Sequence, residues 1–283
     1  MDGFFQALSS YSFLQHALLA GVLASIAAGI AGTYVVVKRI SLISGGIAHS
    51  ILGGMGIAYY FGFDPAQGAV ISALIAAVII GLVSLKARQH EDTVIGALWA
   101  VGMAIGIVFI ARTPGYNVDL MTFLFGNILL VSSEDLLLIA LLDGLILVIT
   151  VLFYKQFLAV AFDEEHAQLR GMPVEFLYLL LLMLIALTVV ILIKIVGLIL
   201  AIALLTLPPA IANRYAGSLA QMMLLAVGLG MFFNAAGLLV SYQADLPTGA
   251  TIVLIAGAAY LLALMGRRFE KAPAVESRGQ SSS

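Results

Sequence analysis

The stretch "LLLIALLDGLILVIT" (Leu136–Thr150) carries one charged side chain, Asp143, in an otherwise apolar run. Similar runs recur along the 283 residues, of which 63% are hydrophobic and only 10% are charged. A soluble domain has about 25% charged residues, and a helix needs about 20 consecutive apolar residues to cross a bilayer. We therefore interpret the chain as an integral membrane protein.

The apolar runs are continuous and not alternating, which favours helices over the strands of a barrel, and only these two structures satisfy every backbone group in lipid. The predicted fold class is all-α, a polytopic membrane protein with about nine transmembrane helices. The segment 118–131 is too short to span comfortably and is predicted to be a re-entrant or interfacial helix. The nine predicted helices lie near residues 15–37, 47–62, 67–85, 93–111, 135–154, 174–193, 196–212, 218–241 and 247–266.

Basic residues indicate the orientation, because loops rich in Lys and Arg stay in the cytoplasm. With nine crossings, most of the basic residues fall on one side, and the N-terminus falls outside. Arg112 and Lys194 are on the minority side. We predict one transmembrane domain over residues 1–268 and a disordered polar tail over 269–283. The majority set is Lys38, Arg39, Lys86, Arg88, Lys155, Arg170, Arg214, Arg267, Arg268 and Lys271.

Several function classes lack support in the sequence. A net charge of −2 suggests no nucleic-acid partner, and the absence of cysteine excludes disulfides and thiolate metal sites. There is no G-x-x-x-x-G-K-[ST] loop, so the chain cannot itself hydrolyse ATP by that chemistry. H-E-x-x-H and nucleophile-elbow patterns are absent too. We predict that the chain is not an enzyme.

A histidine stands among glycines in "SGGIAHSILGG" (Ser44–Gly54). On a helix, Gly45, His49, Gly53 and Gly56 share one face. The stripe is compatible with a close helix contact in which the histidine bonds a neighbour. It is equally compatible with a transient metal ligand in a polar pathway, since imidazole suits zinc, copper and iron and ionisable groups in membranes usually face a cavity.

Other polar residues interrupt the predicted membrane helices. A charge at Asp143 is costly unless the side chain is neutral, paired or in a cavity, so a ligand role stays one of several alternatives. Asn127 and Asn234 are more typical of hydrogen-bond partners between helices than of ligands. Pro208, in "LPPA" (Leu207–Ala210), predicts a break or kink, because proline removes a backbone donor.

The longest polar insert lies on the predicted cytoplasmic side, in "FDEEHAQLRGMPVEF" (Phe162–Phe176). It is compatible with a short surface helix that ends at Gly171, before Pro173 opens the next membrane helix. One interpretation is a solvated loop, and the other is a docking helix for a soluble partner.

Taken together, these motifs resemble those of the ABC-3 family, the permease subunits of bacterial and archaeal ABC importers for zinc, manganese and iron. The resemblance covers residues from about 13 to 266, and its strength lies in the order of six motifs that are individually weak. The motifs are "SLISGGIAHSILGG" (Ser41–Gly54), "IGALWAVGMAIGIVFI" (Ile95–Ile110), "LFGNILLVS" (Leu124–Ser132), "FDEEHAQLRGMP" (Phe162–Pro173), "VGLILAIALLTLPPAIA" (Val196–Ala212) and "LVSYQADLPTGATIVL" (Leu239–Leu254).

The resemblance implies a fold like that of the vitamin B12 and siderophore importers. It implies a homodimer with a translocation path near its axis, two ABC ATPase subunits that hold the ATP, and an extracellular or periplasmic metal-binding protein. It also implies surrounding lipid, a bacterial or archaeal plasma (inner) membrane, and no permanently bound cofactor. ATP binding and hydrolysis would drive alternating access. The coupling helix would lie at Asp163–Gly171 and include Asp163, Glu164, Glu165, Arg170 and Gly171.

The chain departs from many family members at Gly45, where they carry an aspartate four residues before the histidine. Loss of this oxygen ligand favours zinc over manganese as the transported metal, because manganese prefers carboxylates. Asp245, in "ADLPTGAT", suits a turn beside Pro247 and Gly249. It would alternatively attract a cation at the outer mouth, so the predicted metal residues are His49, Asp143 and Asp245.

Two other functions remain open on the sequence. A permease of the same architecture could import a metal chelate such as a siderophore or cobalamin, with a wider lumen and no need of His49. A proton-coupled secondary transporter could use Asp143 and His49 as a relay, with no docking helix and no ATPase.

Overall fold

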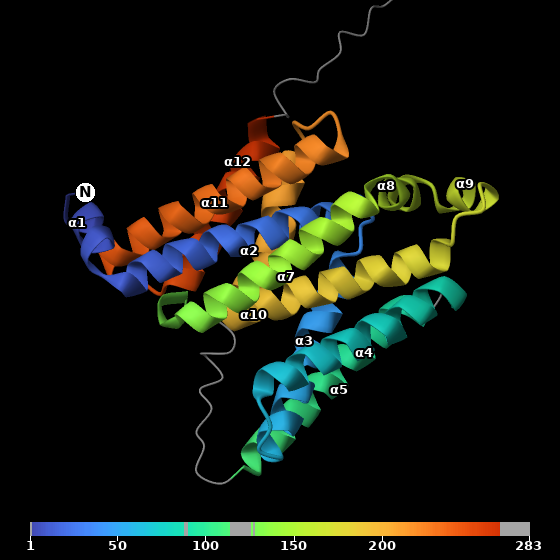
Figure 1. The fold of residues 1–283 in the computed structure, drawn as a ribbon, viewed down its shortest axis with the longest axis horizontal. Helices are drawn as coiled ribbons and strands as arrows, with labels where there is room; N and C mark the ends of the chain where they lie inside the picture. The colour runs from blue at the N-terminus through green and yellow to red at the C-terminus, as the bar shows by residue number, and fades with distance from the viewer. Residues whose placement is uncertain (1, 88–89, 114–125, 127, 267–283) are drawn as a thin grey trace, which may run out of the picture.

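The computed structural model describes residues 2–87, 90–113, 126 and 128–266, and all regular elements in these ranges are helical (Figure 1). The predicted all-α class is therefore confirmed. Asn127, most of the predicted segment 118–131 and the predicted tail 269–283 lie outside the described residues. The elements are α1 (Asp2–Ser10), α2 (Ser12–Val37), α3 (Ser41–Tyr60), α4 (Pro65–Lys86), α5 (Glu91–Ala111), η2 (Ile128–Leu130), α7 (Ser133–Leu152), α8 (Tyr154–Phe162), α9 (Glu164–Leu169), α10 (Val174–Ala212), α11 (Leu219–Ala244) and α12 (Thr248–Gly266).

Eight of these helices are long and apolar enough to cross a membrane. Their bounds follow the predicted segments closely, except that α3 begins at Ser41 and not near residue 47. The glycines and serines of that first turn lower its hydropathy, although the backbone is already helical. The short helices α1 and α8 were not predicted, because neither contains an apolar run long enough to span a bilayer.

Helix α10 contains two helices, as the sequence predicted, and they meet at Gly197. Gly197 has φ 81° and ψ 171°, a conformation that is essentially restricted to glycine. Gly126, which also has a positive φ of 62°, lies directly against the backbone of Val196 and Gly197. A side chain at either glycine would therefore be strained, and one at Gly126 would also collide with the turn.

The two parts of α10 run across the molecule and back. Before the turn, Lys194 pairs with Asp135 at the start of α7. After the turn, the chain passes Gly32 of α2 and ends at Ala212, which packs with Val36 and Val37. Lys38, which directly follows the last residue of α2, pairs with Glu164 of α9. Helix α9 comes shortly before α10 in the sequence. Both ends of α10 therefore share the Lys38 face, on which the sequence also places most basic residues.

Of the break or kink predicted at Pro208, the break does not occur, and the kink stays a prediction. The helix continues through Pro208 and Pro209 to Ala212, and the non-helical residue is Gly197. Pro208 and Pro209 lie in the last turns of the helix, and Pro209 packs against Gly32, where the missing side chain makes room for the ring. A proline removes one backbone donor, but a glycine with positive φ is needed to reverse the chain.

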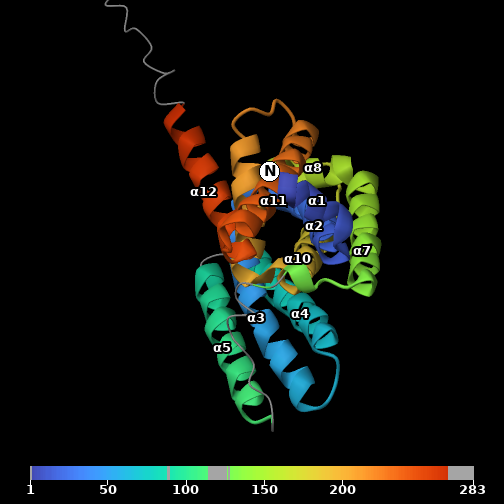
Figure 2. The ribbon, with the colours of Figure 1, turned by 90° about the vertical axis from the view of Figure 1, so that its left-hand side faces the viewer.

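The helices form two neighbouring groups. Figures 1 and 2 show α3, α4 and α5 as one bundle beside a second group of α2, α7, α10, α11 and α12. Helix α10 joins the groups, since it packs against α2, α11 and α12 on one side and α3 and α4 on the other. Helix α2 is mostly buried, whereas few side chains of α5 and α12 are fully buried, as expected of helices that face lipid or another membrane subunit.

Candidate functional site

His49 lies at the contact between α3 and α5. Its ring stacks on Trp99, with centroids 3.9 Å apart and planes at 12°, and its Nδ1 is 3.2 Å from the Sδ of Met103. His49 itself is only 9% exposed, while Trp99 is 36% exposed. The imidazole is thus buried, and one of its two neighbours, Trp99, is itself partly exposed. Trp99, the only tryptophan of the chain, and Met103 belong to the motif Ile95–Ile110, but their contact with His49 was not predicted.

The glycine stripe beside His49 forms a close helix contact at most of its positions. A Cβ on Gly53 would stand 2.8 Å from the carbonyl oxygen of Gly102, and one on Gly56 would stand 2.6 Å from that of Gly106. These glycines therefore bring the backbones of α3 and α5 into direct contact. Gly45 differs, because its added Cβ would meet only Trp99, at 3.8 Å. Space is left beside the imidazole at that one position.

A cavity of about 560 Å³ lies next to this contact, between α3, α4 and α5. Its lining is mainly apolar and includes Ile57, Ile71 and Ile105, and His49 is not part of it. Within one subunit, the histidine therefore faces its aromatic and thioether neighbours and not this cavity.

The three predicted metal residues lie in different places. Among the described residues, no group of three or more His, Asp or Glu side chains could hold a metal ion together. Asp143 lies on the buried face of α7, which packs against α2, and neither of its oxygens has a hydrogen-bond partner in the described part of the chain. His49, Asp143 and Asp245 thus form no common site within one subunit.

Asp245 ends α11 in the left-handed conformation, with φ 51° and ψ 47°. Its backbone N–H donates to the carbonyl of Ser241, and Pro247 follows, so the residue does form the turn that the sequence allowed. It also lines a cavity of about 420 Å³ with Tyr242 and Thr248. The turn therefore leaves the carboxylate exposed beside hydroxyl groups, a setting that can attract a cation.

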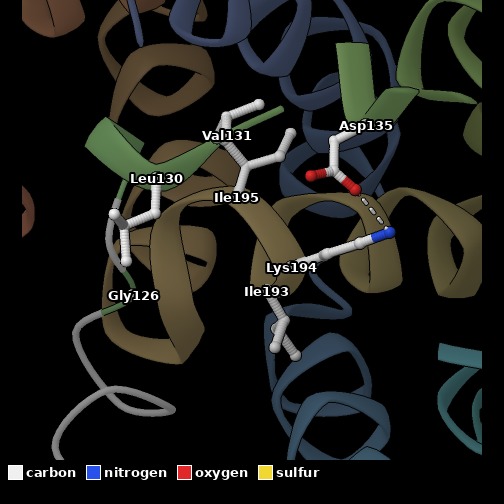
Figure 3. Close-up of a pocket in the computed structure, with 7 residues that line it drawn as sticks. All are labelled: Gly126, Leu130, Val131, Asp135, Ile193, Lys194 and Ile195. Carbon is white, nitrogen blue, oxygen red and sulfur yellow. Dashed lines mark ion pairs between the residues drawn. The ribbon is translucent and has the colours of Figure 1, made fainter. Parts of the chain in front are cut away.

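A smaller cavity of about 180 Å³ lies at the turn of α10 (Figure 3). Asp135 and Lys194 form an ion pair of 2.7 Å at its edge. Asp135 also completes a capping box with Ser132 at the start of α7. The sequence pattern Ser132–Asp135 could have indicated the cap, but no pattern pointed to the pairing with Lys194, which is distant in sequence. The ion pair gives a structural role to Lys194, one of the two basic residues that the predicted topology places on the outer side.

Asn234 connects α11 to α2. Its Nδ2 donates to the carbonyl of Gly21 at 3.3 Å and to the Oγ of Ser25 at 3.0 Å, as well as to Gly230 of its own helix at 3.0 Å. It is 4% exposed. These donor contacts connect α11 to α2, while the Oδ1 of Asn234 is buried without a hydrogen-bond partner in the described part of the chain.

The polar insert forms the short helix α9. Asp163 caps it by accepting from the N–H of His166, and Gly171, with φ 75°, follows its end.

The two sides of α9 differ. Leu169 is 82% exposed, and Glu165 and Arg170 are exposed as well. Glu164 differs, because its carboxylate pairs with Lys38 at 2.6 Å. The helix thus has an inner side fixed to the membrane helices and an outer side with an unburied leucine.

The fold and these sites define a polytopic α-helical membrane protein with a structured helix on one face. The family model for the ABC 3 transport family matches residues 10–267, so the chain belongs to this family. It is thus a permease subunit and not an enzyme.

Known proteins resemble the chain over nearly its whole length. A membrane protein of Synechocystis whose function is uncharacterized is 48% identical, covering 95% of this chain and 95% of the relative. The manganese transport system membrane protein MntC of Halalkalibacterium halodurans is 39% identical, covering 92% and 89%. The structure of PsaBC from Streptococcus pneumoniae in complex with Fab matches with a TM-score of 0.84 at 34% identity, covering 93% of this chain and 95% of that chain.

Proposed function

We propose that the chain is the membrane-spanning permease subunit of an ATP-driven importer for a divalent transition metal. The main support is the family match over residues 10–267. In this proposal the chain forms a homodimer in the plasma (inner) membrane of a bacterium or archaeon. Two separate ATPase subunits bind at the Lys38 face, which is cytoplasmic, and an extracellular or periplasmic binding protein delivers the metal at the opposite face.

In the proposed mechanism, α9 is the docking helix for the ATPase. Its outer side offers Leu169, which is 82% exposed, between the charged side chains of Glu165 and Arg170. An apolar side chain surrounded by charges is typical of the centre and rim of a protein interface. The solvated-loop interpretation leaves this exposed leucine without a role.

His49 is the proposed transient metal ligand. Its Nδ1 and the thioether of Met103 are adjacent, and Trp99 covers the ring. A single imidazole with a thioether forms a weak site, which suits transport because the ion must leave again. Movement of Trp99 would expose the ring to the path, so binding would occur in only part of the transport cycle.

Two arguments about the metal point in different directions. Imidazole and thioether ligands, with no carboxylate at Gly45, favour zinc over manganese. One relative, 39% identical, is named as a manganese transport protein. Our proposal on ligand chemistry is zinc, and direct competition between the two ions tests it.

The proposed function is tested by reconstituting the chain with its ATPase subunit in vesicles and supplying its metal-binding protein. Uptake of radiolabelled Zn²⁺ and Mn²⁺ should require ATP and a functional ATPase, and unlabelled Zn²⁺ should compete better than unlabelled Mn²⁺. An ATPase variant that binds but cannot hydrolyse ATP is the control. Uptake driven by a proton gradient with this inactive ATPase would instead support secondary transport. Uptake of a metal chelate, with no uptake of the free ions, would support the chelate importer.

A further inference from the structure

Lys38, at the end of α2, is a buried cation that joins four helices. Its side chain is 7% exposed. The Nζ donates to Glu164 Oε1 of α9 at 2.6 Å and to the carbonyl of Val160 of α8 at 2.9 Å. It also lies 5.1 Å from the centroid of the Tyr178 ring on α10, which is within the range of a cation–π contact.

The hydroxyl of Tyr178 continues this set of contacts to α4 and α5. It lies 3.0 Å from Ser84 Oγ, and Ser84 Oγ donates to Glu91 Oε2 at 3.1 Å. Because the single hydroxyl proton of Ser84 is used on Glu91, Tyr178 donates to Ser84. We call Glu164, Lys38, Tyr178, Ser84 and Glu91 the polar chain. It runs from the proposed docking helix to the first turn of α5.

Helix α5 is also the helix that contacts the proposed metal ligand. Trp99 stacks on His49 and Met103 contacts its Nδ1, and both side chains belong to α5. The backbones of α3 and α5 touch at Gly53 and Gly102, so a shift of α5 at this contact cannot be absorbed by flexible side chains.

We propose that Lys38 is a positioning residue that transmits movement of α9 through Tyr178, Ser84 and Glu91 to α5, and so to the side chains around His49. This inference rests on the proposed function, in which an ATPase moves α9. It assigns Glu164 a role different from that of its neighbours. Glu165, Leu169 and Arg170 face outward to the ATPase, whereas Glu164 connects α9 to the interior.

The physical argument is that the middle of the polar chain, Lys38, Tyr178 and Ser84, is buried, while Glu164 and Glu91 at its ends are half-buried. Separating the Lys38 ammonium from the Glu164 carboxylate would leave a buried cation without its counter-charge, so the two move together. The hydrogen bonds from Tyr178 to Glu91 have fixed donors and acceptors, and they are directional. Contacts of this kind transmit a displacement, whereas a contact made only by dispersion permits sliding.

The test measures metal ions imported per ATP hydrolysed in the reconstituted complex, with Zn²⁺ and Mn²⁺ as probes. Lys38→Met keeps the apolar stem and removes the cation. We expect ions per ATP to fall by about tenfold, within the usual range of coupling between two sites. The ATPase should still co-purify, because the outer side of α9 is intact. Lys38→Arg, which keeps the positive charge, should restore most of the coupling.

Lys155→Met is the matched control, since Lys155 is an exposed lysine on neighbouring α8. It should leave ions per ATP unchanged. Tyr178→Phe removes only the hydroxyl that contacts Ser84 and should lower ions per ATP by about threefold. If Lys38→Met prevents assembly with the ATPase, Tyr178→Phe provides the decisive measurement, because its ring and packing are kept.

Equal ions per ATP in wild type and Lys38→Met, or in wild type and Tyr178→Phe, would overturn the role of the polar chain. So would an equal loss in Lys38→Met and Lys155→Met. Failure of the proposed function is a separate result. In that case the wild-type chain with bound ATPase would import neither ion when ATP is supplied.

Discussion

The contact between α3 and α5 differs from the contact between α2 and α11, although both contain a buried polar side chain. At α2–α11, Asn234 donates to Gly21 and Ser25 of the partner helix and is enclosed by α2, which is mostly buried. At α3–α5, His49 meets a thioether and an aromatic ring, and α5 is mostly exposed.

The difference indicates which polar group is structural and which is available for function. The amide of Asn234 uses its donors in strong, directional hydrogen bonds, so the group stabilises one arrangement of helices. A thioether is only a weak acceptor, so the imidazole of His49 gives up little when it binds something else. Trp99, which stacks on the imidazole, is itself partly exposed. The following predictions test this comparison, from the largest expected effect to the smallest.

Gly53→Ala should destabilise the α3–α5 contact, with the largest effect among these variants. The new methyl group would stand 2.8 Å from the carbonyl oxygen of Gly102, and both are on helix backbones that cannot easily move. Overpacking of this kind costs about 1–3 kcal/mol, measured as a lower thermal midpoint of the purified chain in detergent. Gly45→Ala is the matched control and should behave as wild type, because its methyl group has ordinary contact distances. Equal stability of the two variants would contradict the close backbone contact.

His49→Phe should separate ring stacking from metal binding. The phenyl ring can still stack on Trp99 but has no nitrogen to bind a cation. Uptake of Zn²⁺ in the reconstituted complex should fall by about tenfold, which corresponds to about 1.4 kcal/mol. The amount of folded protein, measured by size-exclusion chromatography, should stay the same. Normal uptake by His49→Phe would remove His49 from the pathway and leave it a packing residue.

Asn234→Ala should affect stability and leave transport by the folded fraction intact. It removes the hydrogen bonds to Gly21 and Ser25, and bonds between membrane helices are worth about 0.6–2 kcal/mol. The thermal midpoint should fall, while uptake per folded molecule stays at the wild-type value. Loss of uptake at unchanged stability would show that the α2–α11 contact has a role in transport that its geometry does not suggest.

Gly45→Asp should produce the smallest effect, a change in metal preference. The site has space for the side chain, since an added Cβ meets only Trp99 at 3.8 Å. On α3 the new carboxylate would share a face with His49, and oxygen ligands favour manganese. The ratio of Mn²⁺ to Zn²⁺ uptake should rise by about threefold, which corresponds to about 0.7 kcal/mol. An unchanged or lower ratio would show that position 45 does not contact the ion.

Much of the candidate site could be identified from local sequence, but its contacts could not. The stripe that contains Gly45 and His49 follows from helix periodicity, and the short helix α9 follows from the cap at Asp163 and the stop at Gly171. The separate role of Glu164 did not follow, because it depends on Lys38, more than a hundred residues away. The pairing of Asp135 with Lys194 did not follow from the sequence either, because the two residues belong to different helices. Sequence patterns report neighbours along one element, and these pairs join different elements.

The sequence by itself determined the all-α membrane class, the approximate helices and the family. These depend on the length of apolar runs and on local periodicity, which each segment carries regardless of its neighbours. Only the tertiary structure decided that α10 turns at Gly197 and not at Pro208, that His49 lies beneath Trp99, and that Lys38 connects α9 to α10. The physical reason is that each of these features depends on a close approach between distant segments, which no segment specifies alone.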